Sequence, residues 1–182
     1  GGSWQGDVAR FSEAPLPLRA GVRDVVQARL DHLSKASQAA LRLAAVLGSE
    51  FDFDLLNATW DRGVEAALEA LDELLRHRLL EENRGTTKRD YAFTHHKIQE
   101  VVYDGMDRRR RQHLHGLVGK TMAALLGPEA EARSSELAIH FEQGCKLDRG
   151  LTEKAIHHLS QAGDQARDLY ACQEAIDYYQ RA

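Results

Sequence analysis

The sequence predicts an all-α protein with a small β-hairpin wing, in which a winged-helix domain is followed by helical hairpins of the tetratricopeptide type. Three observations support this fold class. Apolar residues recur at three-to-four-residue spacing along most of the chain, only 3 of the 182 residues are proline, and one interval near residues 79–94 changes to a two-residue alternation. The chain is therefore expected to be helical except for one hairpin.

The first 20 residues differ from the rest. They lack helical periodicity and contain Pro15-Leu-Pro17, so an extended lead-in is expected. Gly1-Gly2-Ser3 resembles an expression scar, and the pattern is still helical at Ala182, so the chain is expected to be a segment of a longer protein.

Helices of the winged-helix domain are expected next. Ser34 is placed to cap the second helix, Gly48 to end it in a left-handed conformation, and Asp54 to cap a short helix that runs through Trp60. The expected apolar faces are Val22, Val25, Val26, Leu30 and Leu33 on the first helix; Ala39, Ala40, Leu43, Ala44 and Leu47 on the second; and Val64, Ala67, Leu68, Leu71, Leu74 and Leu75 on the fourth.

The hairpin is expected to follow these helices. Residues 79–82 and 91–94 are the predicted strands, and the polar, glycine-bearing loop 83–90 between them carries Lys88 and Arg89 at its tip. Helices followed by a hairpin with a basic tip give the order of elements in a winged helix.

Further helices are expected beyond His95. One runs to about Met106, and a longer one ends at Gly127-Pro128. The expected apolar faces are Leu114, Leu117, Val118, Met122 and Leu125; then Leu137, Ala138 and Phe141; then Ala155, Ile156, Leu159, Ala162 and Ala166; and last Ala171, Ala175, Ile176 and Tyr179. The predicted division is a lead-in at 1–20, a winged-helix domain at 21–95, connecting helices at 96–127, and the start of a tetratricopeptide-like superhelix at 128–182.

Composition excludes several classes of function. The net charge of −4 and pI near 6.1 argue against a general nucleic-acid-binding surface, which needs clustered Lys and Arg. The chain has neither an apolar run long enough for a membrane span nor a leader, so a cytoplasmic location is expected. Cys145 and Cys172 have no CxxC partner, and reduced thiols are expected instead of a zinc site or a disulfide framework.

His95 is the main candidate site residue. Tyr91 and Phe93 alternate as in a strand, whereas Ile98, Val101 and Val102 have helical spacing, so His95 lies where a strand runs into a helix. A histidine can donate a hydrogen bond to phosphate when it is neutral or protonated, which suits a nucleotide-sensing role. The alternative is a histidine that only holds strand to helix.

Two basic segments are candidate docking or anion contacts: Lys88 with Arg89, and the run Arg108, Arg109, Arg110 and Arg111. A DNA-binding role is disfavoured, because the supposed recognition helix exposes an acidic face that Arg76 and Arg78 only partly offset. That face is formed by Glu65, Glu69, Asp72 and Glu73. The arginine run is expected to be a solvated helix start or a docking surface for a nucleotide-binding domain.

Other motifs are weaker. Gly116-Leu-Val-Gly119-Lys120-Thr121 lacks P-loop spacing, since the required first glycine position is Leu114, so it is expected to be core helix. The pairs His113/His115 and His157/His158 have no metal-ligand spacing, and no metal site is expected.

Several stretches together resemble the region that follows the nucleotide-binding core of bacterial STAND-type ATPases, the signal-transduction ATPases with numerous domains. Such ATPases occur in large transcriptional activators, in multidomain adenylate or guanylate cyclases, and in some kinases. The matching stretches are Leu16-Pro17, Val26 to Ser34, Ala44 to Phe51, Ala67 to Leu74, Phe93 to Tyr103, Arg111 to His115, Leu137 to Phe141 and Glu174 to Ala182.

The resemblance implies a winged helix followed by the first tetratricopeptide-like helices of a sensor superhelix. His95 matches the histidine of the family's Met-His-Asp signature, which contacts the β-phosphate of ADP in the resting state. This chain departs from the signature with Thr94 in place of Met and His96 in place of Asp.

The expected function is therefore regulatory. The chain is expected to be non-catalytic and to hold no cofactor of its own, while the full protein binds ATP or ADP. The expected partners are the NTPase domain of the same protein and a protein or peptide ligand on the superhelix, with neither nucleic acid nor membrane. Two alternatives stay open: a DNA-binding winged-helix transcription regulator, and a tetratricopeptide-type scaffold for protein interaction.

Overall fold

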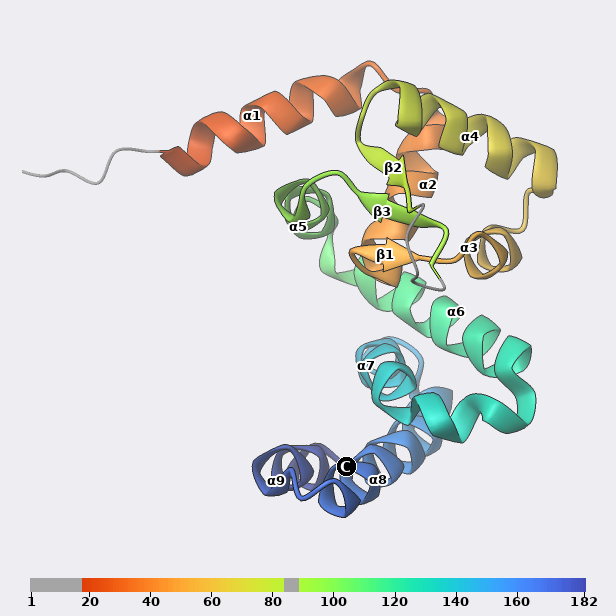
Figure 1. The fold of residues 1–182 in the computed structure, drawn as a ribbon, viewed down its shortest axis with the longest axis vertical. Helices are drawn as coiled ribbons and strands as arrows, with labels where there is room; N and C mark the ends of the chain where they lie inside the picture. The colour runs from red at the N-terminus through yellow and green to blue at the C-terminus, as the bar shows by residue number, and fades with distance from the viewer. Residues whose placement is uncertain (1–17, 84–88) are drawn as a thin grey trace, which may run out of the picture.

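The computed structural model describes residues 18–83 and 89–182, and it confirms the predicted fold class of helices with one small antiparallel sheet (Figure 1). The elements of the first part are α1 (Leu18–Asp31), α2 (Lys35–Leu47), β1 (Glu50–Phe51), α3 (Phe53–Trp60), α4 (Val64–Arg76), β2 (Leu80–Glu82) and β3 (Tyr91–Phe93). Those of the second part are α5 (His96–Asp104), α6 (Arg108–Leu126), the 3-10 segment η1 (Gly127–Arg133), α7 (Ser134–Cys145), η2 (Arg149–Leu151), α8 (Thr152–Asp168) and α9 (Cys172–Arg181). Most of the predicted lead-in lies outside the described residues, and α1 begins at Leu18, within its last residues.

The elements α2 to β3 form what we call the wing lobe. Their order, with a sheet in which β3 lies between β1 and β2, is that of a winged helix. The predicted hairpin is confirmed as β2 and β3, which pair antiparallel with Leu80 opposite Phe93. Strand β1 was not predicted, and it pairs with β3 through Phe51 opposite Tyr91. A two-residue strand is too short to show a periodicity, so only its partner reveals it.

Aromatic rings join the sheet to the wing lobe's core. Phe51 is fully buried, and its ring stacks on Tyr91 at 5.8 Å and meets the edge of Phe93 at 6.5 Å. The predicted face of α4 is confirmed at Ala67, Leu71 and Leu74, which are buried in the hydrophobic core. Val64 and Leu68, predicted on the same face, are instead exposed at its edge, as is Val25 on α1.

The predicted cap of α2 is confirmed, since the Ser34 hydroxyl accepts a hydrogen bond from the Ser37 backbone N–H at 3.1 Å. Gly48 ends this helix with φ 136° and ψ −170°, a conformation that favours glycine but is not the predicted left-handed helical one. Helix α3 starts two residues earlier than expected, with Asp52 at the N-cap position, so Asp54 lies in its first turn instead of capping it. The N–H of Phe53 is satisfied by the Asp90 carboxylate at 2.8 Å.

Glu73 has a different role from the one expected of the acidic face of α4. Its half-buried carboxylate accepts hydrogen bonds from the Ser34 backbone N–H at 2.9 Å and from the Ser37 hydroxyl at 2.5 Å. These hydrogen bonds, that of Ser37 first, lower the pKa of Glu73 to about 2. Glu73 therefore ties α4 to the start of α2.

Replacing Glu73 by glutamine should reduce the free energy of unfolding at neutral pH by about 1–2 kcal/mol, allowing for the partial exposure of the carboxylate. The folded pKa lies below the ordinary value of 4.5, so this stabilisation is complete above about pH 4.5 and is lost as the pH falls through about 2. Urea unfolding of the variant and of Asp72→Asn, an exposed neighbour, measures the difference. An equal loss in both variants would contradict the role assigned to Glu73.

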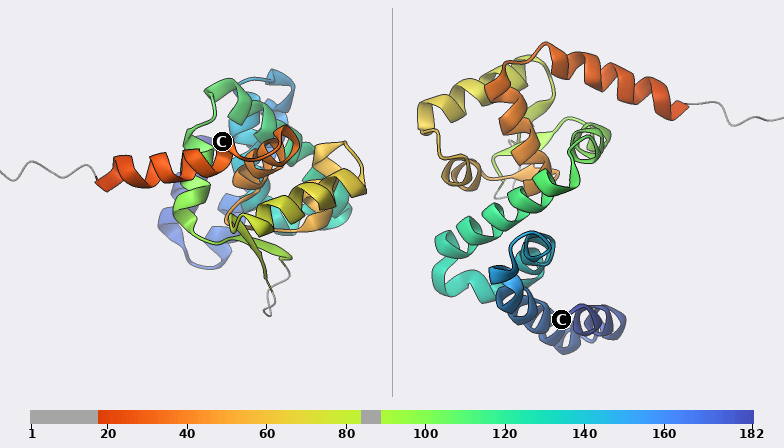
Figure 2. Two further views of the ribbon diagram at one scale, coloured as in Figure 1. Left: turned by 90° about the horizontal axis from the view of Figure 1, so that it is seen from above. Right: turned by 180° about the vertical axis from the view of Figure 1, so that it is seen from behind.

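Helices α6 to α9 form what we call the hairpin lobe, in which each helix packs against the next (Figures 1 and 2). Helices α6 and α7 approach each other closely where Gly116 faces Gly144 and Gly119 lies against the ring of Phe141. Helix α6 buries this glycine side, so Leu117 and Leu125, predicted to face the core, are exposed. Ile156, Ile176 and Tyr179 on the later helices are exposed as well.

The two lobes share buried contacts. One hydrophobic cluster extends from Val26 on α1 to Val118 on α6, and a second joins Leu55 of α3 to Met122 and Phe141. The core therefore continues across residues 95 and 96, and the predicted domain boundaries remain predictions. Within the described ranges, no helix is both long and apolar enough to span a bilayer.

Candidate functional site

The predicted change from strand to helix at His95 is present. Strand β3 ends at Phe93, and the Thr94 hydroxyl donates a hydrogen bond to the Arg78 carbonyl at 2.9 Å. His95 has an extended backbone, with φ −146° and ψ 130°, and its carbonyl accepts from the N–H of Ile98 at 2.9 Å. The backbone of the junction is thus fixed from both sides.

The His95 side chain, in contrast, is exposed and makes no hydrogen bond or ion pair with any residue in the described parts of the chain. Its neighbour His96 is engaged within α5, with Nε2 3.2 Å from the Glu100 carboxylate and Nδ1 3.1 Å from the Gln99 side-chain oxygen. The strand is joined to the helix by Thr94 and the backbone, and the His95 imidazole is left available to a ligand.

The basic hairpin tip behaves differently from the expectation. Lys88 lies outside the described residues. Arg89 turns toward the body of the protein, where its guanidinium lies 2.7 Å from the Asp52 carboxylate and 3.2 Å from that of Glu136. Arg89 thus links the wing to α3 and α7, and its charge is already compensated by two carboxylates.

Glu136 receives a second arginine at the same place. Arg133 donates to both of its carboxylate oxygens, at 3.1 Å and 2.5 Å. Burial alone would raise the pKa of Glu136, but the hydrogen bond and charge of Arg133, with the charge of Arg89, bring that pKa below its ordinary value. The carboxylate therefore remains ionised between its two arginines.

The arginine run forms the start of α6, as predicted. Asp107 caps this helix by accepting a hydrogen bond from the Arg110 N–H at 2.9 Å. Arg108, Arg109 and Arg110 are exposed, whereas Arg111 is half-buried with its guanidinium 5.2 Å from the centre of the Tyr103 ring. Arg108 and Arg111 line one hollow with Lys146 of the segment after α7. Among the predicted contacts that the structure describes, Arg108 and Arg111 share this hollow.

A buried histidine pair was missed by sequence reasoning. His115 Nδ1 lies 3.0 Å from His140 Nδ1, and His115 Nε2 lies 2.8 Å from the Tyr103 hydroxyl, so α5, α6 and α7 are joined by one chain of polar groups. Burial, then the charge of His140, lowers the pKa of His115 to about 3, and burial lowers the pKa of His140 to about 4. Both imidazoles are therefore neutral at physiological pH.

One signal in the sequence pointed to His115. It lies four residues before Gly119 and seven before Met122, so the three share the buried face of α6. The sequence neighbour His113, with which it was compared, is exposed. His140 is 25 residues away, and only the tertiary structure pairs the two rings.

The glycine-bearing segment 116–121 and possible metal ligands are the two remaining features. The segment from Gly116 to Thr121 lies inside α6, so the prediction that it is core helix is confirmed. Across the described part of the chain, no cluster of three or more His, Cys, Asp or Glu side chains is arranged to hold a metal ion.

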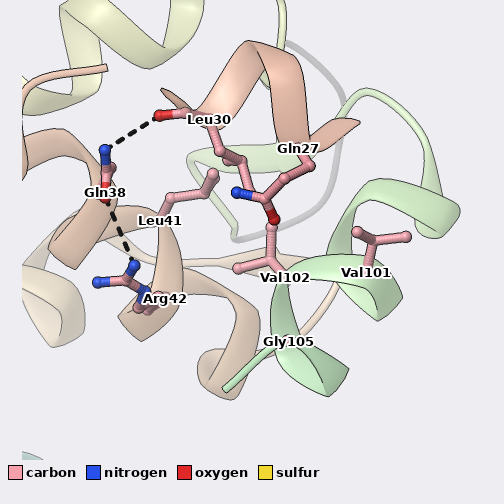
Figure 3. A pocket seen from close by; sticks show the side chains of 8 residues that line it. All are labelled: Gln27, Leu30, Gln38, Leu41, Arg42, Val101, Val102 and Gly105. Atoms are coloured by element: carbon pink, nitrogen blue, oxygen red, sulfur yellow. Dashed lines mark hydrogen bonds between the residues drawn. The ribbon is translucent and has the colours of Figure 1, made fainter. Parts of the chain in front are cut away.

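A small hollow lies between α1, α2 and α5 (Figure 3). The Gln38 amide crosses its side, donating to the Leu30 carbonyl at 3.1 Å and accepting from Arg42 at 3.4 Å. Its volume of about 60 Å³ is enough for ordered water but not for a nucleotide. This hollow is therefore not the place where a nucleotide is bound.

Comparison with known proteins gives little functional information. The chain is 30% identical over 178 residues to a protein of Rhizobium meliloti (strain 1021) that is named only as uncharacterized. The match covers 97% of this chain and 17% of that protein, so the chain spans about a sixth of its relative's length. No family model matches the chain. No solved structure matches it either.

Proposed function

We propose that this chain is a non-catalytic, cytoplasmic signal-relay segment of a STAND-type ATPase. It couples the nucleotide state of a neighbouring NTPase domain to the hairpin lobe, which binds a protein or peptide. The observation that carries the proposal is the exposed His95 side chain, without a partner among the described residues, on a junction whose backbone is held by Thr94 and Ile98. The resemblance of this stretch to the family's phosphate-contacting signature supports the same role.

In the proposed mechanism, His95 contacts the nucleotide in the resting state and loses this contact when a ligand binds. In the resting state His95 donates a hydrogen bond to the β-phosphate of ADP bound by the NTPase domain, which holds the wing lobe closed over the nucleotide. Helix α5 follows His95 directly and is joined to α6 and α7 through Tyr103, His115 and His140. A ligand that displaces the hairpin lobe would therefore act on the junction through packed helices, and the wing lobe would swing away from the nucleotide.

The hairpin lobe offers a surface for such a ligand. Large apolar side chains are exposed on α8, on α9 and in the turn between them, and Leu169 and Tyr170 are 79% and 90% exposed. Large exposed apolar side chains are common on protein contact surfaces. This feature supports a protein or peptide as the sensed partner.

The charges on α4 and at the wing argue against a winged helix that binds DNA. Glu65, Glu69 and Asp72 are exposed on α4, where they would meet phosphates with like charge. Arg89 is engaged with Asp52 and Glu136, so it is not a free contact at the wing. An electrophoretic shift with steep salt dependence would favour DNA binding over the signal-relay role.

The test is the release of ADP from the full-length protein. Replacing His95 by alanine is expected to accelerate release of a fluorescent ADP analogue by about tenfold, the equivalent of one charge-assisted hydrogen bond, and to raise basal activity. His96→Ala is the matched control, because His96 is exposed next to His95 but is engaged with Glu100. Unchanged release in His95→Ala, or equal acceleration in both variants, would count against the sensor role.

A further inference from the structure

A basic hollow lies where α5, α6 and the end of α7 meet. It has a volume of about 290 Å³ and is lined by Tyr103, Arg108, Arg111, Gln112, Gln143 and Lys146. None of these residues belongs to the strand-to-helix junction at His95. The hollow is therefore a separate feature from the proposed nucleotide sensor.

Three cationic side chains face this hollow. Arg108 and Lys146 form no ion pair with the residues that the structure describes, and Arg111 lies 3.6 Å from the exposed carboxylate of Asp104. Arg108 and Arg111 also occupy the first turn of α6, where the positive end of the helix dipole adds to their charge. Positive groups gathered at the N-terminal end of a helix repel each other unless an anion compensates them.

Gln112 adds a polar group to the lining of the hollow. Its side chain is only 7% exposed, and its amide has no hydrogen-bond partner among the described residues. The amide atoms are not shielded from solvent, so they can bond to water or to a ligand in the hollow. Gln143 already accepts a hydrogen bond from Lys146 at 3.1 Å, which draws the ammonium group toward the same rim.

The positive potential of the hollow reaches the buried histidine pair. After burial and the charge of His140, the charges of Arg111 and Lys146 contribute to lowering the pKa of His115. Tyr103 lines the hollow, and its hydroxyl is hydrogen-bonded to the same imidazole at 2.8 Å. An anion in the hollow would thus lie next to Tyr103, which is bonded to the histidine pair that joins α6 and α7.

We propose that this hollow binds the phosphate group of a phosphorylated small molecule. Arg108, Arg111 and Lys146 supply the charge, and the Gln112 amide N–H donates to a phosphate oxygen. Arginine and lysine together favour phosphate because the guanidinium donates two parallel hydrogen bonds and the ammonium group adds a point charge. The volume admits a phosphate with part of the group that carries it.

The test uses the 182-residue chain itself. Inorganic phosphate, ADP and adenosine are titrated at constant ionic strength, and binding is followed by calorimetry and by the shift in melting temperature. We expect saturable binding of inorganic phosphate with a millimolar dissociation constant and no binding of adenosine. Equal affinity for phosphate and ADP would identify the phosphate group alone as the ligand, whereas tighter binding of ADP would identify a nucleotide.

Variants separate this site from general charge. Arg108→Ala and Lys146→Ala are expected to weaken phosphate binding about tenfold each, and Gln112→Leu by a similar factor. Arg109→Ala is the matched control, because it removes the same charge from the same turn but Arg109 does not line the hollow. Circular dichroism checks that each variant is folded. Absence of saturable phosphate binding, or equal weakening by Arg109→Ala and Arg108→Ala, would overturn the proposal.

Discussion

Replacing Gly144 by alanine should reduce the free energy of unfolding by about 2 kcal/mol and the melting temperature by roughly 4–8 °C. A Cβ atom at this position would lie 2.6 Å from the Cα and 2.9 Å from the N of Gly116. Both are backbone atoms of the facing helix, so α6 and α7 must separate to admit the methyl group. The gain in helix propensity on replacing glycine, about 1 kcal/mol, offsets only part of this cost.

Gly116→Ala is the matched control for this prediction. Its Cβ would meet the tip of the Leu151 side chain at 3.1 Å, while the Gly144 Cα lies at an ordinary 3.6 Å. A leucine side chain can move where a helix backbone cannot, so the loss is expected to be less than half that of Gly144→Ala. Gly21→Ala, where the methyl group would meet open space, gives the baseline. Thermal unfolding measures the melting temperatures of the three variants. Equal melting temperatures would contradict the close crossing of α6 and α7.

The second large effect is acid sensitivity caused by His115 and His140. Their folded pKa values, about 3 and about 4, lie below the ordinary value of 6.5. Below about pH 6.5 the unfolded chain therefore binds protons that the folded protein does not. The free energy of unfolding consequently decreases as the pH decreases. Each histidine contributes up to about 1.4 kcal/mol per pH unit, so the pair gives a slope of up to about 2.7 kcal/mol per pH unit. The full stability is present above about pH 6.5 and is lost as the pH falls toward the two folded values.

The geometry explains why the folded pair resists protonation. The two Nδ1 atoms are 3.0 Å apart, so one must carry a hydrogen and the other must accept it. Protonating both rings would place two N–H groups against each other in a buried site beside Arg111 and Lys146, whose charges further disfavour the imidazolium form of His115.

His115→Gln tests this account, because glutamine is polar but has no proton to gain in this range. The variant is expected to be less stable than the wild type at about pH 7, by roughly 1–2 kcal/mol, with an acid slope that is shallower by about 1.4 kcal/mol per pH unit. His113→Gln, on the exposed side of the same helix, should keep the wild-type slope. Denaturant unfolding between about pH 7 and about pH 5 measures both. Parallel slopes for all three proteins would refute the role of the buried pair.

The limits of sequence inference are visible at particular residues. Local periodicity was enough for the helices, for the β2–β3 hairpin and for the junction at His95, because those patterns arise from contacts between near neighbours in the chain. It failed for the buried face of α6, where Leu117 and Leu125 are exposed while His115, Gly116 and Gly119 are buried. The hydrophobicity of a residue does not show which side of its helix a neighbouring helix approaches. In this protein α7 approaches the side of α6 that carries Gly116 and Gly119.

Some of the candidate site residues could likewise be identified from the sequence, and others could not. The sequence marked His95 and the arginine run, since their residue types and their place at helix starts are local properties. It did not distinguish Arg108 and Arg111, which line a hollow with Lys146, from Arg109 and Arg110, which do not. Nor could it show that Arg89 is held by Asp52 and Glu136, which are 37 and 47 residues away.

Periodicity along the chain was thus enough to predict the fold class, the main helices, the β2–β3 hairpin and the strand-to-helix junction. The pairing of β1 with β3, the hydrogen bond between Glu73 and Ser34, the histidine pair and the basic hollow became visible only in the folded protein. Each of these depends on side chains or strands from distant parts of the chain, brought together by the packing of helices that a one-dimensional period cannot specify.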